Sequence, residues 1–351
     1  MKAGKSLVEL AQELQSRADR KADYVADTRA VTMDEKGAGL VIASADPIAL
    51  SVDTHTHRQI GTHLGIPSKY YDRMLAEQPA LLAQNVNTWF HEDPSRRMIR
   101  ALDGKARAFL SDRYRRIDNE EVAEAVLPVL LESAQDIRIE SCEVTDRKLY
   151  LKAVFPRIEG EVAKGDVVQS GIVISNSEIG AGSLSVQPMV FRLVCTNGMI
   201  AQDSGMRRYH VGQKVGDGLD VEALLRDETK RLSDQALLAA LQDVVRASLA
   251  QVQFDALLKR MREATDGPRI ERPVEAVEQL GKSFVIPQVE RQSILENLIR
   301  GGDYSRWGML NAVTAVANDH ESYDRATELE AMGGQILDLA ANDWTVIAQA
   351  A

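Results

Sequence analysis

The side chains best suited to hold an anion are concentrated between residues 96 and 116. This stretch carries eight Lys or Arg residues against two carboxylates, Asp103 and Asp112, although the 351-residue chain has a net charge of −10. Proteins that bind single-stranded nucleic acid combine a cationic groove for phosphates with aromatic rings on which bases stack. Phe109 and Tyr114 supply such rings here, so the stretch has the chemistry of a phosphate and base site.

Asp103 and Gly104 predict a β-hairpin in this stretch, because Asp-Gly between two alternating runs favours a two-residue type I′ turn. The expected cross-strand pairs are Leu102 with Lys105, Arg100 with Arg107, Met98 with Phe109 and Arg96 with Ser111. The opposite face is then small and apolar, and consists of Ile99, Ala101, Ala106, Ala108 and Leu110. Directly opposed like charges are mildly destabilising. A sheet that keeps Arg100 opposite Arg107 therefore suggests a bound anion.

The hairpin is the candidate nucleic-acid site. The residues expected to bind are Arg96, Arg100, Lys105, Arg107, Arg113 and Arg115 for phosphates, Phe109 and Tyr114 for stacking, and Arg207 and Arg208 from a second basic cluster. The alternative is a solvated hairpin face, or arginines that pair with carboxylates elsewhere in this acidic chain.

A second candidate is a helix-turn-helix over residues 58–75. Gly61, then Gly65 four residues later, then the apolar Ile66 match the rhythm of that motif. Its second helix would present Lys69, Tyr70 and Arg73 to duplex DNA, together with Ser68. The alternative is an ordinary helical hairpin joined by a glycine turn.

Signatures of an enzyme or a metal site are weak. His55 and His57 share a His-x-His spacing, with His63 and His91 further on, but no carboxylate or cysteine stands at a telling distance. Cys195 would need His210 to act as a nucleophile, and a packing cysteine is the more common role. Gly180-Ala181-Gly182 lacks the third glycine of a dinucleotide site. We expect no cofactor and no metal, and the sequence favours a protein without enzymatic activity.

Composition limits the class of protein. The net charge of −10 argues against a protein that coats nucleic acid with its whole surface, but it permits a local basic site. The two cysteines form no disulfide framework. No apolar run is long enough to span a bilayer, and the N-terminus continues into an amphipathic helix. These features predict a cytoplasmic protein without a membrane partner.

Periodicity predicts an α+β fold in three parts. Residues 1–95 form a mixed, mostly helical segment with helices at about 56–64, 68–77 and 79–88, and residues 96–212 form a mostly antiparallel sheet module that contains the hairpin. In this module two strands flank a turn at residues 145–148, and Asn197-Gly198 closes a later strand with a turn. Residues 213–351 form a helical region. Its pattern over 221–264 predicts one long helix, or two that are broken near Ser233, and such helices would serve oligomerisation. There is no internal repeat with a period of 20–50 residues.

Four segments, in this order and spacing, resemble the domain-of-unknown-function family numbered 932, which is described as phage/plasmid-like. They are residues 64–71, 107–119, 192–198 and 307–314. The resemblance spans about 40–340 and implies no particular activity. It does imply a mobile-element setting, in which DNA handling is a frequent task.

The leading hypothesis is a non-enzymatic DNA-binding protein that favours single strands, assists annealing or recombination, and forms a homo-oligomer. One alternative is a regulator that reads duplex DNA through Lys69, Tyr70 and Arg73. The other is a structural or interaction protein that does not bind nucleic acid.

Overall fold

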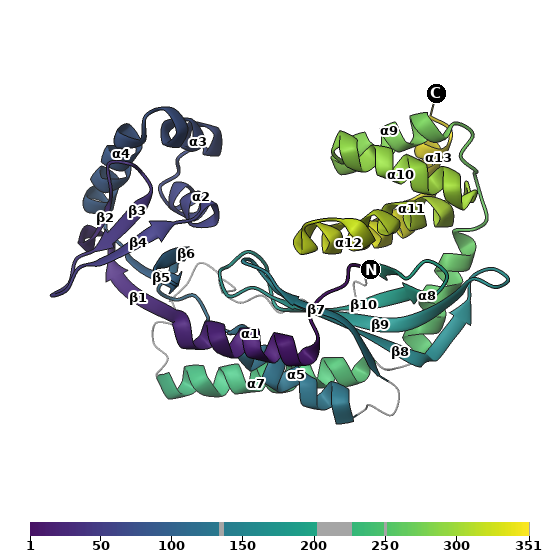
Figure 1. Ribbon diagram of the computed structural model, residues 1–351, viewed down its shortest axis with the longest axis horizontal. Helices are drawn as coiled ribbons and strands as arrows, with labels where there is room; N and C mark the ends of the chain where they lie inside the picture. Colours follow the sequence, from purple (N-terminus) through teal and green to yellow (C-terminus); the bar gives the residue numbers. More distant parts are fainter. Residues whose placement is uncertain (133–136, 202–226, 249–250, 351) are drawn as a thin grey trace.

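The structure, a computed structural model, describes residues 1–132, 137–201, 227–248 and 251–350. It confirms the predicted α+β class. Two antiparallel-rich sheets form two lobes, with helices on one face of the first sheet and on both faces of the second (Figure 1). Helices dominate the described chain from α7 to the C-terminus.

The first lobe is a six-stranded sheet with the order β1-β5-β6-β4-β3-β2. Its strands are β1 (Lys21–Asp27), β2 (Val31–Met33), β3 (Gly39–Ile42), β4 (Ile48–Val52), β5 (Arg96–Leu102) and β6 (Lys105–Ser111). The helices α2 (Thr54–His63), α3 (Ser68–Glu77) and α4 (Pro79–Glu92) pack on one of its faces. The core between them includes Leu40, Ile60, Leu82 and Phe90, which are fully buried.

The predicted hairpin is present as β5 and β6, in the middle of this sheet. Asp103 and Gly104 both have positive φ (52° and 72°), as a type I′ turn requires. The predicted pair Leu102–Lys105 forms, but a β-bulge between Arg100 and Ala101 then shifts the register. Beyond the bulge the pairs are Arg100 with Ala108, Ile99 with Phe109, Met98 with Leu110 and Arg97 with Ser111.

The expected pairs Arg100–Arg107, Met98–Phe109 and Arg96–Ser111 are therefore wrong. One inserted residue moves every later side chain to the opposite face. Phe109 now faces the α2–α4 core with Ile99, whereas Leu110 joins Met98 on the other face.

The second lobe contains a curved five-stranded sheet with the order β11-β10-β9-β8-β7 (Figure 1). Its strands are β7 (Arg138–Val144), β8 (Leu149–Glu161), β9 (Val167–Asn176), β10 (Ser185–Arg192) and β11 (Asn197–Ile200). The turn expected at Asn197-Gly198 lies earlier, since Leu193–Thr196 make the turn and Asn197 begins β11.

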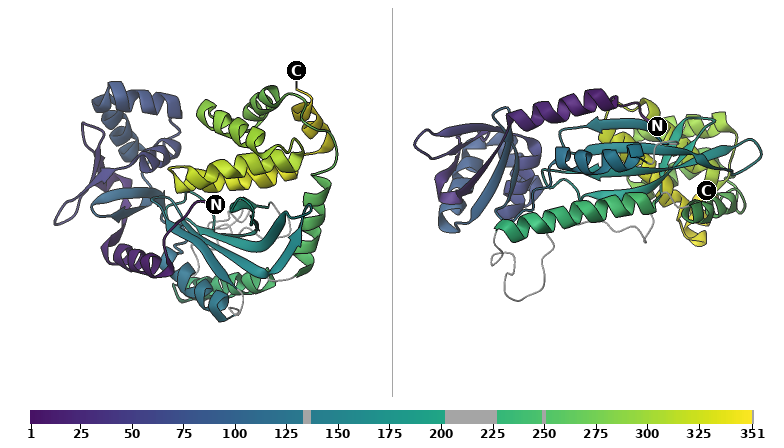
Figure 2. Two further views of the ribbon diagram at one scale, coloured as in Figure 1. Left: turned by 45° about the vertical axis from the view of Figure 1, so that its right-hand side comes forward. Right: turned by 90° about the horizontal axis from the view of Figure 1, so that it is seen from below.

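Helices cover both faces of this second sheet. On one face lie α1 (Leu7–Arg20), α5 (Asn119–Glu132) and α7 (Asp227–Ala247), which share a core with Leu151 and Ile172 (Figure 2). At the far end of the same face, α8 (Gln251–Glu263) packs in one core with Val168, whereas α12 (Tyr323–Leu337) packs near Val173 on the other face. The chain expected to be one long helix, or two broken near Ser233, is thus α7 and α8, and Ser233 lies inside α7.

The remaining helices form a layer beside α12. They are α9 (Pro273–Phe284), α10 (Gln288–Gly301), α11 (Arg306–Asp319) and α13 (Ala341–Ala348). No helix in the described part of the chain combines the length and apolarity of a bilayer span.

The lobes divide the chain differently from the predicted parts. The expected boundary at residue 96 runs through the six-stranded sheet, because β5 and β6 pair with β1 and β4. The hairpin therefore belongs to the first lobe and not to the sheet of residues 138–200. The second expected boundary, at residue 213, lies outside the described residues.

Candidate functional site

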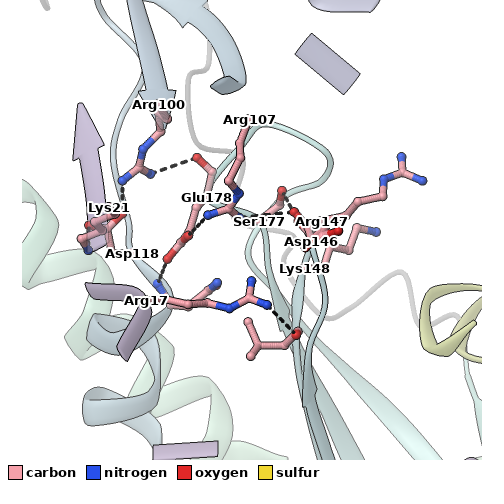
Figure 3. Close-up of polar contacts among 12 residues, drawn as sticks. Arg17, Lys21, Arg100, Arg107, Asp118, Asp146, Arg147, Lys148, Ser177 and Glu178 are labelled. Carbon is pink, nitrogen blue, oxygen red and sulfur yellow. Dashed lines mark hydrogen bonds and ion pairs between the residues drawn. The ribbon is translucent and has the colours of Figure 1, made fainter. Parts of the chain in front are cut away.

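Arg100, central to the predicted site, is buried between the two lobes. Its side chain is 5% exposed, and its Nε and Nη2 donate to Asp23 (2.8 Å) and Asp118 (2.6 Å). Its Nη1 donates to the carbonyl oxygen of Glu178 at 3.0 Å (Figure 3). Burial alone would lower the pKa of Arg100, but Asp118 and Asp23 outweigh it and the pKa is raised. Its charge is already balanced inside the protein.

Arg107 is also buried, but its charge is less well compensated. Its Nη1 lies 3.6 Å from a carboxylate oxygen of Glu178, and its Nη2 donates to the Asp146 carbonyl at 3.3 Å (Figure 3). Nε makes no hydrogen bond within the described part of the chain. Burial lowers the pKa of Arg107 in spite of Glu178, and the nearby Arg17 lowers it further. The guanidinium nonetheless spans from β6 to the turn that joins β7 and β8.

Both arginines contact the loop of residues 177–184, which connects β9 to β10. The backbone amide of Asn119 donates to Glu178 at 2.8 Å, and Tyr114 donates through its hydroxyl to the Ser177 carbonyl at 3.1 Å. From α2, Gln59 donates to the Ile179 carbonyl at 2.8 Å. This loop is the joint between the lobes, so the buried arginines of the hairpin have a structural role.

The other predicted site residues are distributed over several environments. Phe109 is 3% exposed and stacks on Phe90 at 5.5 Å, so the interpretation of Phe109 as a stacking platform for bases is wrong. Tyr114 is half-buried against the joint, and Arg115 pairs with Asp234 of α7. The predicted cations that stay exposed are Arg96, Lys105 and Arg113. Arg207 and Arg208 lie outside the described residues.

The histidines and cysteines that the structure describes form no common site. His55 lies 3.0 Å from the Ile179 carbonyl through Nε2, whereas His63 accepts from Arg97. Among the described residues, no group of three or more His, Cys, Asp or Glu side chains could hold a metal ion. Cys142 is buried, and burial raises the pKa of its thiol to about 11. Cys195 is exposed near Arg192, and His210 lies outside the described residues.

Helices α2 and α3 form the compact helical hairpin expected from the glycine spacing. Gly65 ends the first helix with φ +66°, and the Ile66 amide donates back to the Gly61 carbonyl at 2.9 Å. A Cβ on Gly61 would lie 2.9 Å from the ring of Tyr71, so this glycine lets the two helices cross closely. The hydroxyl of Tyr71 in turn lies 3.0 Å from Nδ1 of His57, whose pKa is lowered by burial.

The outer face of α3 is exposed and polar. Lys69, Asp72 and Arg73 are exposed, and Tyr70 is 50% exposed. Arg73 pairs with Glu77 at 2.9 Å on the helix surface, and such exposed pairs are weak. The inner face carries Tyr71 and Met74 into the core. Lys69, Tyr70 and Arg73, the side chains expected to read DNA, are therefore exposed and available to a ligand.

Two further cations lie near the joint, and no sequence pattern distinguishes them from other surface cations. Arg147 and Lys148 lie on the turn between β7 and β8 and point away from Arg107 (Figure 3). Arg147 is exposed, and Lys148 lies against Gly182 of the joint. The sequence predicts a turn at residues 145–148, but it gives no reason to bring that turn beside the hairpin.

Comparison with known proteins gives one match. A family described as "Domain of unknown function (DUF932)" matches residues 108–334, and so starts inside β6 and covers most of the second lobe. No curated protein and no solved structure matches the chain.

Proposed function

The chain belongs to the family of the domain of unknown function numbered 932 (DUF932), a name that assigns no activity, and on that premise we propose from geometry that it binds DNA. In this proposal α2 and α3 act as a helix-turn-helix, and α3 enters the major groove of a duplex. The phage/plasmid-like setting and a cytoplasmic location are part of the same proposal.

One observation carries the proposal. The turn between α2 and α3 combines a left-handed Gly65 with a close helix crossing at Gly61, and the exposed face of the second helix holds Lys69 and Arg73. In helix-turn-helix proteins the second helix lies in the major groove and its N-terminal residues contact base edges. Lys69 and Tyr70 lie in the first turn of α3, at the position from which such contacts are made.

The chemistry of this face suits a duplex. Lys and Arg donate to the O6 and N7 of guanine, and both also neutralise phosphates. Arg73 is free to leave Glu77, since an exposed ion pair contributes little stability. Arg58, exposed on α2, lies on the preceding helix, which in such motifs crosses the phosphate backbone.

Single-strand binding is the less supported form of this proposal. It relied on Arg100, Arg107 and Phe109, and all three are buried. The exposed cations Arg96, Lys105 and Arg113 remain at the surface, but the hairpin offers no exposed aromatic ring among its described residues. Comparison of one sequence as a single strand and as a duplex separates the two forms.

The test is fluorescence anisotropy with a labelled duplex pool and matched single strands over a series of salt concentrations. We expect the duplex to bind more tightly, and we expect Lys69→Ala/Arg73→Ala to weaken duplex binding by about tenfold or more. The double variant should also lower the slope of log K against log salt, by about one for each phosphate that it no longer neutralises.

Lys164→Ala/Arg246→Ala is the matched control, because it removes one exposed lysine and one exposed, ion-paired arginine from the second lobe. Equal weakening by the two double variants would mean that only net charge matters, and would contradict the proposal. Tighter binding of single strands that is insensitive to Lys69 and Arg73 would also contradict it.

A further inference from the structure

Helices α9 and α10 repeat the hairpin geometry of α2 and α3. Val285 ends α9 with φ +53°, as Gly65 ends α2 with φ +66°. The Ile286 amide donates to the Gly281 carbonyl at 2.9 Å, which is the same bond and distance as Ile66 to Gly61. A proline then precedes the second helix in both hairpins, at Pro67 and Pro287.

The two helix crossings are also equivalent. A Cβ on Gly281 would lie 2.2 Å from Cδ of Arg291, which holds the place that Tyr71 holds opposite Gly61. Leu280 and Ile294 are fully buried and correspond to Ile60 and Met74. The sequences around the turns share Gly, Ile and Pro at the same spacing, in Gly61–Pro67 and Gly281–Pro287. The resemblance therefore extends over backbone, crossing and core.

We infer that α9 and α10 are a second DNA-reading unit and that α10 presents it, an inference that rests on the proposed function of α2 and α3. Gln288, Val289 and Gln292 are exposed on the first two turns of α10. A glutamine can bond the N6 and N7 of adenine, and an apolar side chain can contact the methyl group of thymine. Val289 is 79% exposed, so its methyl groups are available for such a contact.

The charges around α10 are compatible with a nearby duplex. Glu290 is held by Arg325 at 2.7 Å, and Glu278 lies 3.4 Å from Arg291, so these carboxylates are compensated internally. Arg291, the one Lys or Arg in the first two turns of α10, is half-buried and already paired with Glu278. The second unit therefore adds preference for A·T pairs and little phosphate attraction. Both units lie on the same side of the second sheet, one on each lobe, so one duplex is the ligand for both (Figure 1).

The test is selection of bound duplexes from a random pool by the full chain, followed by competition binding with the selected sequence. We expect two separated elements in the selected sequence. Gln288→Ala/Gln292→Ala should reduce discrimination between A·T and G·C in only one element, by roughly five-fold or more. The same double variant should leave the salt dependence of duplex binding unchanged. Lys69→Ala/Arg73→Ala should weaken the other element and lower the salt slope.

Gln12→Ala/Gln84→Ala, on exposed faces of α1 and α4, is the matched control, and the thermal midpoint of each variant verifies folding. If Lys69→Ala/Arg73→Ala acts as expected but Gln288→Ala/Gln292→Ala alters no base preference, this inference is overturned and the proposed function stands. If the unaltered chain selects no duplex, both fail. A change in sedimentation with intact base preference would assign α10 to a protein partner and would overturn the inference.

Discussion

The imidazole of His63 lies between a guanidinium and two aromatic rings. Arg97 donates to its Nδ1, and its Nε2 lies 3.3 Å from Oγ of Ser95. The ring centroids of Phe109 and Phe90 are 5.6 and 6.5 Å away. Burial, together with the charge of Arg97, lowers the pKa of His63 to about 4. The neutral ring is therefore the form that the folded protein accommodates.

This environment makes folding sensitive to mild acid. The unfolded chain takes up a proton on His63 near pH 6.5, whereas the folded chain does so only near pH 4, so the free energy of unfolding falls as the pH is lowered across that interval. Between pH 7 and pH 5 we expect His63→Gln to lose about 1 kcal/mol less stability than the unaltered protein, after allowance for partial solvent screening. Urea titrations at both pH values measure this difference.

His91→Gln is the control, because His91 is exposed and lies on the same lobe. An equal pH dependence in His63→Gln and the unaltered protein would show that folding does not lower the pKa of His63, contrary to this expectation.

Arg100 and Arg107 show which properties of a site residue can be inferred from sequence. The turn at Asp103-Gly104 follows from local backbone preference, so the hairpin was predictable. The identity of the partners was not, since Asp23 and Glu178 are distant in sequence and reach the arginines only when the lobes meet. The bulge that turns Phe109 inward likewise depends on the packing of the whole sheet.

At the scale of elements, the two helical hairpins place different residues at the same left-handed backbone position. The left-handed conformation costs an ordinary L-residue about 1–2 kcal/mol, and glycine avoids this cost. Gly65 occupies the position in the first hairpin, and a Cβ there would meet no atom within 4 Å. Val285 occupies it in the second hairpin and is 85% exposed, so little packing offsets its strain.

Exchange of these residues should change stability in opposite directions. We expect Gly65→Val to destabilise the protein by about 1–2 kcal/mol, and Val285→Gly to stabilise it by up to about 1 kcal/mol once the entropy cost of glycine is included. Thermal and denaturant unfolding measure both changes. Val289→Gly makes the same replacement inside α10 and should destabilise the protein by roughly 0.5 kcal/mol, the difference between the helix propensities of valine and glycine. Stabilisation by both valine replacements would contradict the role assigned to the turn.

Some helices and strands could be predicted from the sequence, whereas one turn could not. The helix expected at about 68–77 matches α3, and β7 and β8 lie on either side of the turn expected at residues 145–148. The turn at Asn197-Gly198 was wrong because Thr196 takes the positive φ instead (51°). Asn197 is buried, and its side-chain amide donates to the Asn311 carbonyl at 3.2 Å. That contact comes from α11, which local sequence does not reveal.

At the scale of the whole molecule, a buried ion pair joins the second sheet to the C-terminal helices. Nζ of Lys152, on β8, lies 2.6 Å from a carboxylate oxygen of Glu330, on α12, and neither side chain is exposed. The ammonium also lies 4.6 Å from the centre of the Tyr323 ring. Burial lowers the pKa of Lys152, although Glu330 opposes this effect.

Removal of one partner should leave a buried charge. We expect Lys152→Met to destabilise the protein by about 3–5 kcal/mol, and the double variant Lys152→Met/Glu330→Leu to recover most of that loss, because the uncompensated charge is then gone. Denaturant unfolding of the unaltered protein, both single variants and the double variant provides the cycle. A double variant no more stable than Lys152→Met would mean that packing, and not charge, dominates the contact.

The path of the chain through the two lobes has a further consequence. The chain enters the first lobe at Lys21 and returns at residues 112–118, where Asp118 pairs with Lys21 and Arg116 with Asp23. The helices on either side, α1 and α5, share one core in the second lobe. The first lobe therefore has the form of an insertion between two neighbouring helices, and the family match begins close to its end, at residue 108. A single genetic event could add or remove such a module and leave the fold that carries it intact.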